Sequence, residues 1–190
     1  MNNLLKKTEQ GFALPLALLL LVVMTIMGSI LVNVTSKEHN ANNNKDSNQQ
    51  TFYAAESGIA IAKKWMTDNM TALAATPPNN LNTRNIRFCK ATFFPNLVNS
   101  NNIFATSRQS LSEVITGTTG AETIRLSNYS FEYFIAYSPD SNGNNTIAKK
   151  KTGTNNILYT IYSCGCNKSK DNCNSSDTIV PLEAVVTLVN

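Results

Sequence analysis

The feature that most constrains this chain is an apolar run from Phe12 to Val32, which holds no charged residue and only Thr25 and Ser29 as polar side chains. As an α-helix that rises about 1.5 Å per residue, the run is about 31 Å long, which matches the hydrocarbon core of a bilayer. A chain of 190 residues has room for one modest domain besides such a helix. We therefore expect a membrane-spanning helix over 12–32 that carries one soluble domain.

The charges next to the run predict its orientation. Lys6 and Lys7 precede it, and no comparable basic cluster follows it. Because positive residues beside a spanning helix stay in the cytoplasm, we expect a cytoplasmic N-terminus and an external domain.

An ordinary secretory signal does not fit the run. Such a signal has an apolar region of about 7 to 15 residues followed by an alanine-rich cleavage site, whereas this run is longer and the residues after it, "VNVTSKEHN", contain no alanine. Pro15 adds a constraint, because a proline inside a helix costs about 3 kcal/mol but is tolerated in the first turn. The helix is thus expected to begin near Phe12, directly after Gly11.

A polar leader with two lysines, then Gln10-Gly11, then Phe12 at the start of a long apolar helix, resembles the type III signal of type IV pilins. In that family a prepilin peptidase cuts after the glycine and usually methylates the new N-terminal amine. The resemblance implies a leader over 1–11 and a mature chain that begins at Phe12. The helix would anchor the subunit in the inner membrane and then pack in the core of a pilus (fimbrium) at the cell surface.

One position departs from the pilin pattern. Phe12, Ala13, Leu14 and Pro15 follow it, but the fifth residue is Leu16 instead of glutamate. In major pilins that glutamate pairs with the N-terminal amine of a neighbouring subunit, which offsets the cost of burying either charge alone. The absence of this glutamate matters least in the first subunit of a filament. In lacking it, the chain resembles PilX-type minor pilins and the K-type pseudopilin of type II secretion.

A second motif, "FYAAESGIA" over 52–60, resembles the A-A-E-x-G signature of the N-terminal regions of PilX and K-type subunits. Its signature residues are Ala54, Ala55, Glu56 and Gly58. Both motifs lie in the first third of the chain, in the order that the family has them.

The motif opens an apolar stripe with helical spacing, which we expect to pack on the domain. Thr76-Pro77-Pro78 should end this helix, giving a spine helix over 12–75 with a polar linker over 37–50. Asparagine is a poor helix former, so the linker is expected to be helical only with support from neighbours, and the resemblance implies disorder near Gly28. The stripe consists of Phe52, Ala55, Ile59, Ala62, Met66, Met70 and Leu73.

The remaining residues, 76–190, have the short β-prone runs and turns of a β-rich head. In the second run Phe131, Tyr133, Ile135 and Tyr137 should share one face, with Glu132, Phe134 and Ala136 on the other. We expect an α+β fold in which an antiparallel sheet of about four strands packs on the outer half of the spine helix, as the resemblance to pilins also implies. The expected strands are 122–127, 130–138, 157–164 and 182–189, with a hairpin turn at 128–129, a loop over 138–145 and an irregular connection over 81–120.

All four cysteines lie in this external head, where an oxidising compartment permits two disulfides. A bond between Cys164 and Cys166 would be strained, so we expect Cys89 to pair with one of them and Cys173 with the other. The spacing lacks the paired C-x2-C of a structural zinc site, which argues against a metal.

Nothing in the composition points to catalysis or to a cofactor. The single histidine, His39, lies in the polar linker, and Glu56 has no carboxylate partner nearby in the sequence, so we expect a structural role for it. A net charge of +4 without a broad basic face argues against nucleic acid.

The sequence thus predicts a PilX-type minor pilin, not an enzyme, that joins other minor pilins and the major pilin through its N-terminal helix and primes pilus assembly at the tip. Two alternatives stay open: a tip pseudopilin of type II secretion, or an uncleaved, membrane-anchored adhesin. The sequence contains no feature that distinguishes adhesion, aggregation, motility and DNA uptake as the role of such a pilus.

Overall fold

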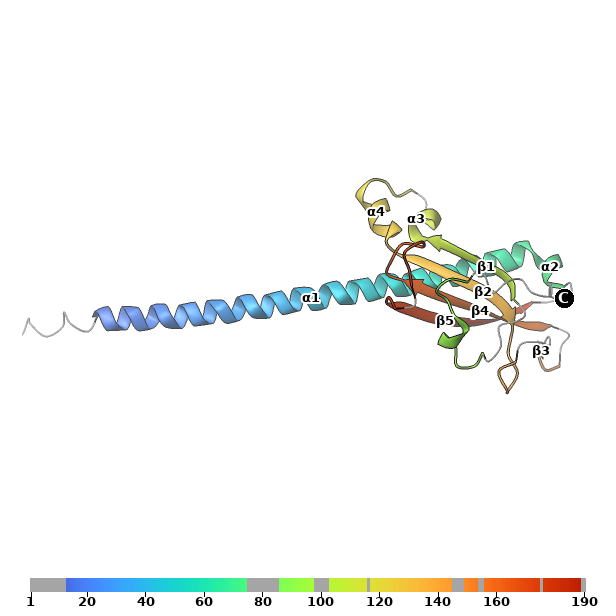
Figure 1. Ribbon diagram of the computed structural model, residues 1–190, viewed down its shortest axis with the longest axis horizontal. Coiled ribbons are helices and arrows are strands. Elements are labelled where there is room, and N and C mark those ends of the chain that lie inside the picture. Colours follow the sequence, from blue (N-terminus) through green and yellow to red (C-terminus); the bar gives the residue numbers. More distant parts are fainter. Residues whose placement is uncertain are drawn as a thin grey trace, which may run out of the picture. The chain divides into compact units, whose positions relative to one another are not determined.

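The computed structural model describes residues 13–74, 86–97, 103–115, 117–144, 149–153, 156–174 and 176–188. These residues fall into two compact units that divide between Asp46 and Ser47. The elements in chain order are α1 (Ala13–Asp68), α2 (Met70–Ala74), η2 (Ala91–Phe93), β1 (Ile103–Ser110), α3 (Leu111–Val114), α4 (Ala121–Ser127), β2 (Ser130–Tyr137), β3 (Lys149–Lys150), β4 (Ile157–Cys166) and β5 (Ile179–Leu188) (Figure 1).

The first unit is the N-terminal part of α1, which is an unbroken helix. Its hydroxyl groups bond to the helix's own backbone: Thr25 Oγ1 donates to the Val22 carbonyl and Ser29 Oγ to the Ile26 carbonyl, each at 2.8 Å. Such bonds satisfy polar side chains without water, as an apolar surrounding requires. The expected disorder near Gly28 is absent from this structure, because the backbone continues as helix through that residue.

The polar linker over 37–50 is also helical, although its side chains are largely exposed. Helix formation is costly at nucleation and inexpensive at extension. A poor helix-forming stretch between two strongly helical ones is therefore carried along as helix, so in this structure the flanking segments of α1 supply the support.

The second unit holds a five-stranded antiparallel sheet. β2 and β4 form its centre, β1 lies beside β2, β5 lies along the other side of β4, and the short β3 pairs with the first residues of β4. The expected α+β class and the strands near 130–138, 157–164 and 182–189 are confirmed.

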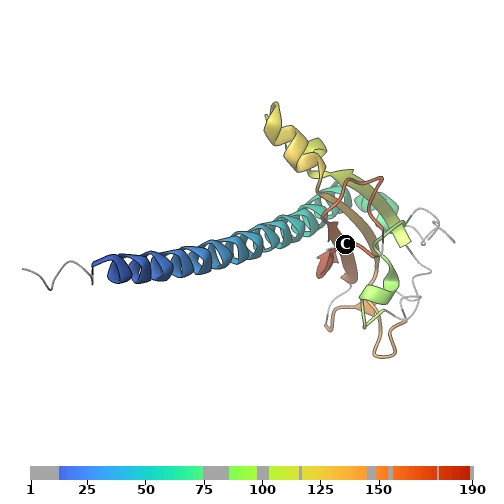
Figure 2. The same ribbon diagram turned by 60° about the vertical axis from the view of Figure 1, so that its left-hand side comes forward.

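Two expectations about the rest of the head were wrong. Residues 121–127 form helix α4 instead of a strand, with Glu122 paired to Arg125 one turn later at 2.8 Å, so no hairpin exists at 128–129. The connection over 81–120 contains a full strand, β1, which pairs with β2 from Ile103 opposite Ala136 to Ser110 opposite Ser130. Figure 2 shows α3 and α4 together beyond the end of β1.

β2, at the centre of the sheet, is covered on both faces, which is why every one of its residues is buried. As the alternation predicted, Phe131, Tyr133 and Ile135 pack with α1 on one side. On the opposite side, Phe134 and Ala136 pack against the segment 86–97, in a second core that contains Phe88, Cys89, Phe94, Leu97, Tyr162, Cys164, Cys166 and Cys173.

Candidate functional site

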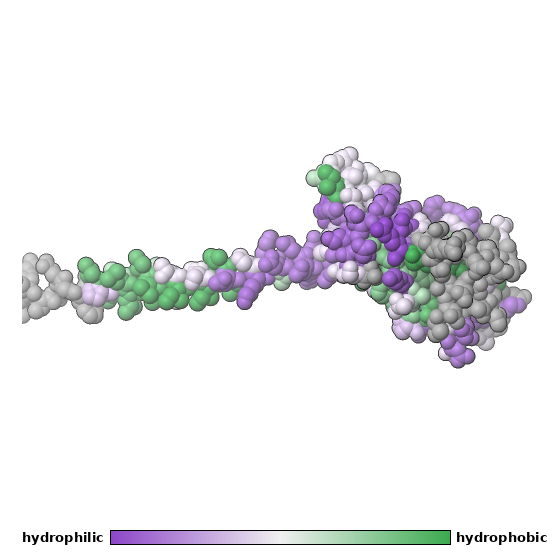
Figure 3. Space-filling model, in the orientation of Figure 1, coloured by the Kyte–Doolittle hydropathy of each residue, from purple (hydrophilic) through white to green (hydrophobic). Residues whose placement is uncertain are grey.

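The first candidate site is the apolar surface of α1 in the first unit. Its large side chains are exposed from Leu14 to Val34, with Leu16 at 55%, and Figure 3 shows them as a nearly continuous hydrophobic stretch. By length and composition, α1 contains a segment that could cross a membrane. A surface of this kind has to be covered by lipid or by other apolar helices. The expected processing residues, Gly11 and Phe12, lie outside the described residues.

The second candidate site is the junction between α1 and the sheet, which lies within the second unit. Small residues form it: Ala54, Ala55 and Ala62 are fully buried there. A Cβ placed on Gly58 would lie 2.2 Å from Ser163 Oγ and 3.0 Å from the Phe131 ring, so a larger residue would force Ser163 to shift. Ser163 Oγ also donates a 2.8 Å hydrogen bond to the Ala55 carbonyl, which ties β4 to α1.

The buried helical face differs from the expected stripe at two positions. Phe52 is 40% exposed and Met70, in α2, is 48% exposed, whereas Thr51 and Ala54 are buried. Ala55, Ala62, Met66 and Leu73 are buried as expected, and Ile59 is half-buried against the core. The expectation for Phe52 was wrong because the helix backbone approaches the sheet so closely that only small side chains fit at this level.

The close approach of α1 to the sheet explains the small residues of the AAESG segment, 54–58. Ala54, Ala55 and Gly58 face the sheet, while Glu56 is exposed. Among the described residues Glu56 has no hydrogen bond or ion pair, so a contact from Glu56 to the sheet is not present.

On the opposite face of the sheet, a buried carboxylate fixes the covering segment. Glu132 is fully buried and accepts backbone N–H groups of Arg87, Phe88 and Cys89 at 2.7–3.0 Å. The Arg108 guanidinium lies 3.8 Å away on the neighbouring strand. A buried charge needs partners of this kind to be tolerated. The sequence signal for this role is an acidic residue, Glu132, within a largely apolar strand, although the sequence does not show which groups it binds.

Two disulfides close the same face. Cys89 is bonded to Cys164, and Cys166 is bonded to Cys173. This pairing agrees with the expected one. Asp177 lies near the second disulfide, but both sulfurs there are consumed by the bond and cannot act as thiolate ligands to a metal. His39 is exposed on α1.

Searches with family models, among curated proteins and among solved structures found no match to this chain.

Proposed function

We propose that the chain is a minor pilin of the PilX type, which is processed after Gly11 and initiates the assembly of a type IV pilus. The observation that carries the proposal is that one helix, α1, combines an exposed apolar segment with a small-residue face buried against an antiparallel sheet. The first property suits a subunit that passes from a membrane to a helix-packed filament core. The second would fix the head on its own helix.

Leu16 supports a position at the tip. It is an exposed leucine where the pilin pattern has a glutamate, so this subunit offers no carboxylate to the N-terminal amine of a subunit ahead of it. The partners in this proposal are other minor pilins and the major pilin, which contact the helix, together with the prepilin peptidase.

The test is the fate of the protein and of the pili in the cells that produce it. Deletion of the chain should lower the number of pili, and the protein should appear in the fraction sheared from the cell surface. Leu16→Glu should reduce its ability to restore pilus number, because an unpaired carboxylate would then have to be buried. A protein that stays wholly in the membrane, with an unchanged number of pili, would favour the anchored adhesin instead.

A further inference from the structure

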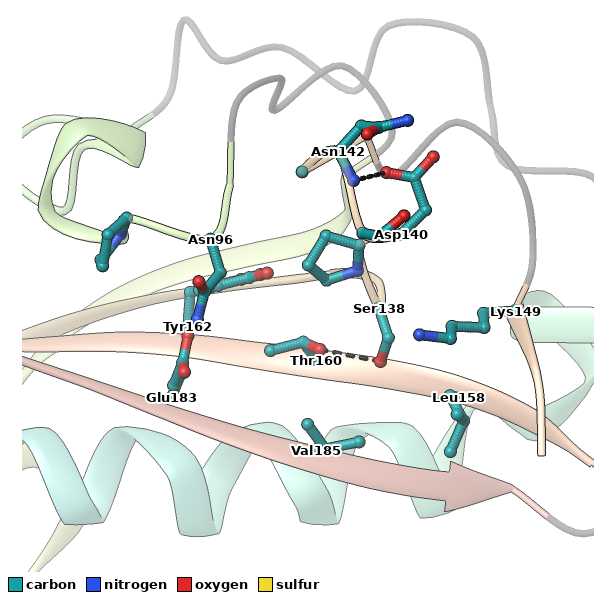
Figure 4. A pocket seen from close by; sticks show the side chains of 14 residues that line it. Asn96, Ser138, Asp140, Asn142, Lys149, Leu158, Thr160, Tyr162, Glu183 and Val185 are labelled. Carbon is teal, nitrogen blue, oxygen red and sulfur yellow. Dashed lines mark hydrogen bonds between the residues drawn. The ribbon is translucent and has the colours of Figure 1, made fainter. Parts of the chain in front are cut away.

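A pocket of about 520 Å³ lies in the second unit, on the face of the sheet opposite α1 (Figure 4). Its floor is formed by Leu158, Thr160 and Tyr162 of β4 and by Glu183 and Val185 of β5. The segment 95–96, the loop 138–143 and Lys149 form its walls. A pocket of this volume is large enough for a small organic ligand.

The wall formed by the 138–143 loop is held in one conformation by its own hydrogen bonds. Ser138 Oγ and Thr160 Oγ1, both buried, lie 2.8 Å apart, and Ser138 N donates to the Leu158 carbonyl at 3.1 Å. One oxygen of Asp140 accepts the N–H groups of Asn142 and Asn144 at 2.8 and 2.9 Å. These bonds keep the pKa of Asp140 below its usual value. The pocket is thus preorganised, which lowers the entropy cost of binding.

Tyr162 places a polar group without a partner at the floor. Its ring stacks on Phe134 at 4.8 Å and contacts the edge of Phe94 at 4.7 Å. Its hydroxyl is buried and makes no hydrogen bond of good geometry to the described residues, although the Thr160 hydroxyl lies close enough to lower the pKa of Tyr162. Burial raises the pKa of Tyr162 to about 12; the Thr160 hydroxyl opposes this rise and the negative charge of Glu183 adds to it, so the Tyr162 hydroxyl remains protonated and able to donate at neutral pH.

The other polar groups of the pocket carry both signs of charge. Figure 4 shows Asn96 and Glu183 near Tyr162 at one end and Lys149 at the other. The carboxylates of Glu183 and Asp140 disfavour an anion such as phosphate. The Lys149 ammonium and the engagement of Asp140 by backbone N–H groups disfavour a metal ion.

We propose that this pocket binds a neutral sugar unit of a glycan. Sugar hydroxyls both donate and accept, so they can donate to Glu183 and accept from Lys149 and, directly or through one water, from Tyr162. The C–H faces of the ring would contact Val185, Leu158 and Pro139, which line the same pocket. The inference does not depend on the proposed role in pilus assembly.

The experiment uses the full chain in phospholipid nanodiscs, because common detergents with sugar headgroups would compete for the pocket. Saturation-transfer NMR with glucose, galactose, mannose, fucose and their N-acetylated amino forms should detect binding of at least one sugar, with a Kd of about 10 mM or tighter. Glu183→Gln should weaken that binding about tenfold or more, because it removes a charged acceptor. Tyr162→Phe, which keeps the ring packing, should weaken it about threefold to tenfold.

Matched controls are Glu56→Gln, an exposed glutamate outside the pocket, and Tyr129→Phe, a half-buried tyrosine outside it. Both should leave the affinity unchanged. The proposal is overturned if none of these sugars binds, if Glu183→Gln binds as tightly as the unaltered chain, or if only the comparison probes glycylglycine, inorganic phosphate or Ca²⁺ bind.

Discussion

Gly165 of β4 lies directly beneath the backbone of α1 at Thr51, so that a Cβ placed on Gly165 would lie 1.9 Å from the Thr51 carbonyl oxygen. Its neighbours Cys164 and Cys166 point to the other face of the sheet, where each forms a disulfide. The three residues "CGC" thus permit the close approach of the helix on one face and fix the covering loops on the other. This point joins the helix and the head.

Gly165→Ala should therefore destabilise the head strongly. The methyl group would meet backbone atoms, which cannot move aside as a side chain can, so we expect a loss of about 3 kcal/mol or more. Urea unfolding followed by tyrosine fluorescence measures it. Gly28→Ala is the matched control, because no atom lies within 4 Å of the added Cβ and alanine favours the helix. Equal stability of the two variants would show that the helix and the sheet do not approach as described.

Glu132→Gln should release the segment that covers the second face. The amide keeps the size of the side chain but replaces one acceptor oxygen by a donor, which would oppose the N–H groups of residues 87–89. We expect a loss of about 3 kcal/mol in the free energy of unfolding. Glu122→Gln on the exposed surface of α4 serves as the control and should change stability little. A small effect of Glu132→Gln would contradict the assigned role.

The two disulfides should contribute unequally. The bond Cys89–Cys164 closes a loop with a sequence separation of 75, and Cys166–Cys173 one of 7. In the loop-entropy description these contribute about 4.5 and about 2.4 kcal/mol. Paired replacement of Cys89 and Cys164 by alanine should thus lower the unfolding free energy by about 2 kcal/mol more than replacement of Cys166 and Cys173. The reverse order in urea unfolding would contradict this assignment.

Stability should fall in alkali because two buried tyrosines resist ionisation. Burial and then the Tyr137 charge raise the pKa of Tyr159 to about 12, and burial and then the Glu183 charge raise that of Tyr162 to about 12. An unfolded tyrosine has a pKa of about 10. The contribution of each protonated tyrosine to the free energy of unfolding is therefore complete below pH 10. It is lost as the pH rises toward 12, by about 1.4 kcal/mol per pH unit. Burial also raises the pKa of Tyr133 and Tyr137, so urea unfolding between pH 9 and 11 should show a shallower slope in Tyr159→Phe, and a flat profile in the unaltered chain would contradict it.

The parts of the fold that follow local pattern could be predicted from the sequence. The apolar run, the alternation in β2 and the strands near β4 and β5 depend on periodicity, which is visible in the residues themselves. β1 was missed because its "TSRQS" half is polar and gains burial only through its pairing with β2. Residues 121–127 alternate too briefly to separate a strand from the helix that forms there.

The sites were harder to predict because they depend on distant contacts. The choice of Thr51 over Phe52 for the buried face of α1 is made by the nearness of Gly165, more than a hundred residues later. The role of Glu132 depends on where residues 87–89 lie, and the pocket is assembled from segments that are far apart in the chain. Contacts between such distant segments produce no periodic pattern in the sequence.

The most direct test of the proposed function is the N-terminus of the protein after coexpression with its cognate prepilin peptidase. Extraction from the membrane followed by intact-mass measurement and N-terminal sequencing should give a chain that begins at Phe12, with a methylated amine. Gly11→Val should block this cleavage and leave membrane insertion intact. A mature protein that still begins at Met1 would contradict the assignment to the pilins.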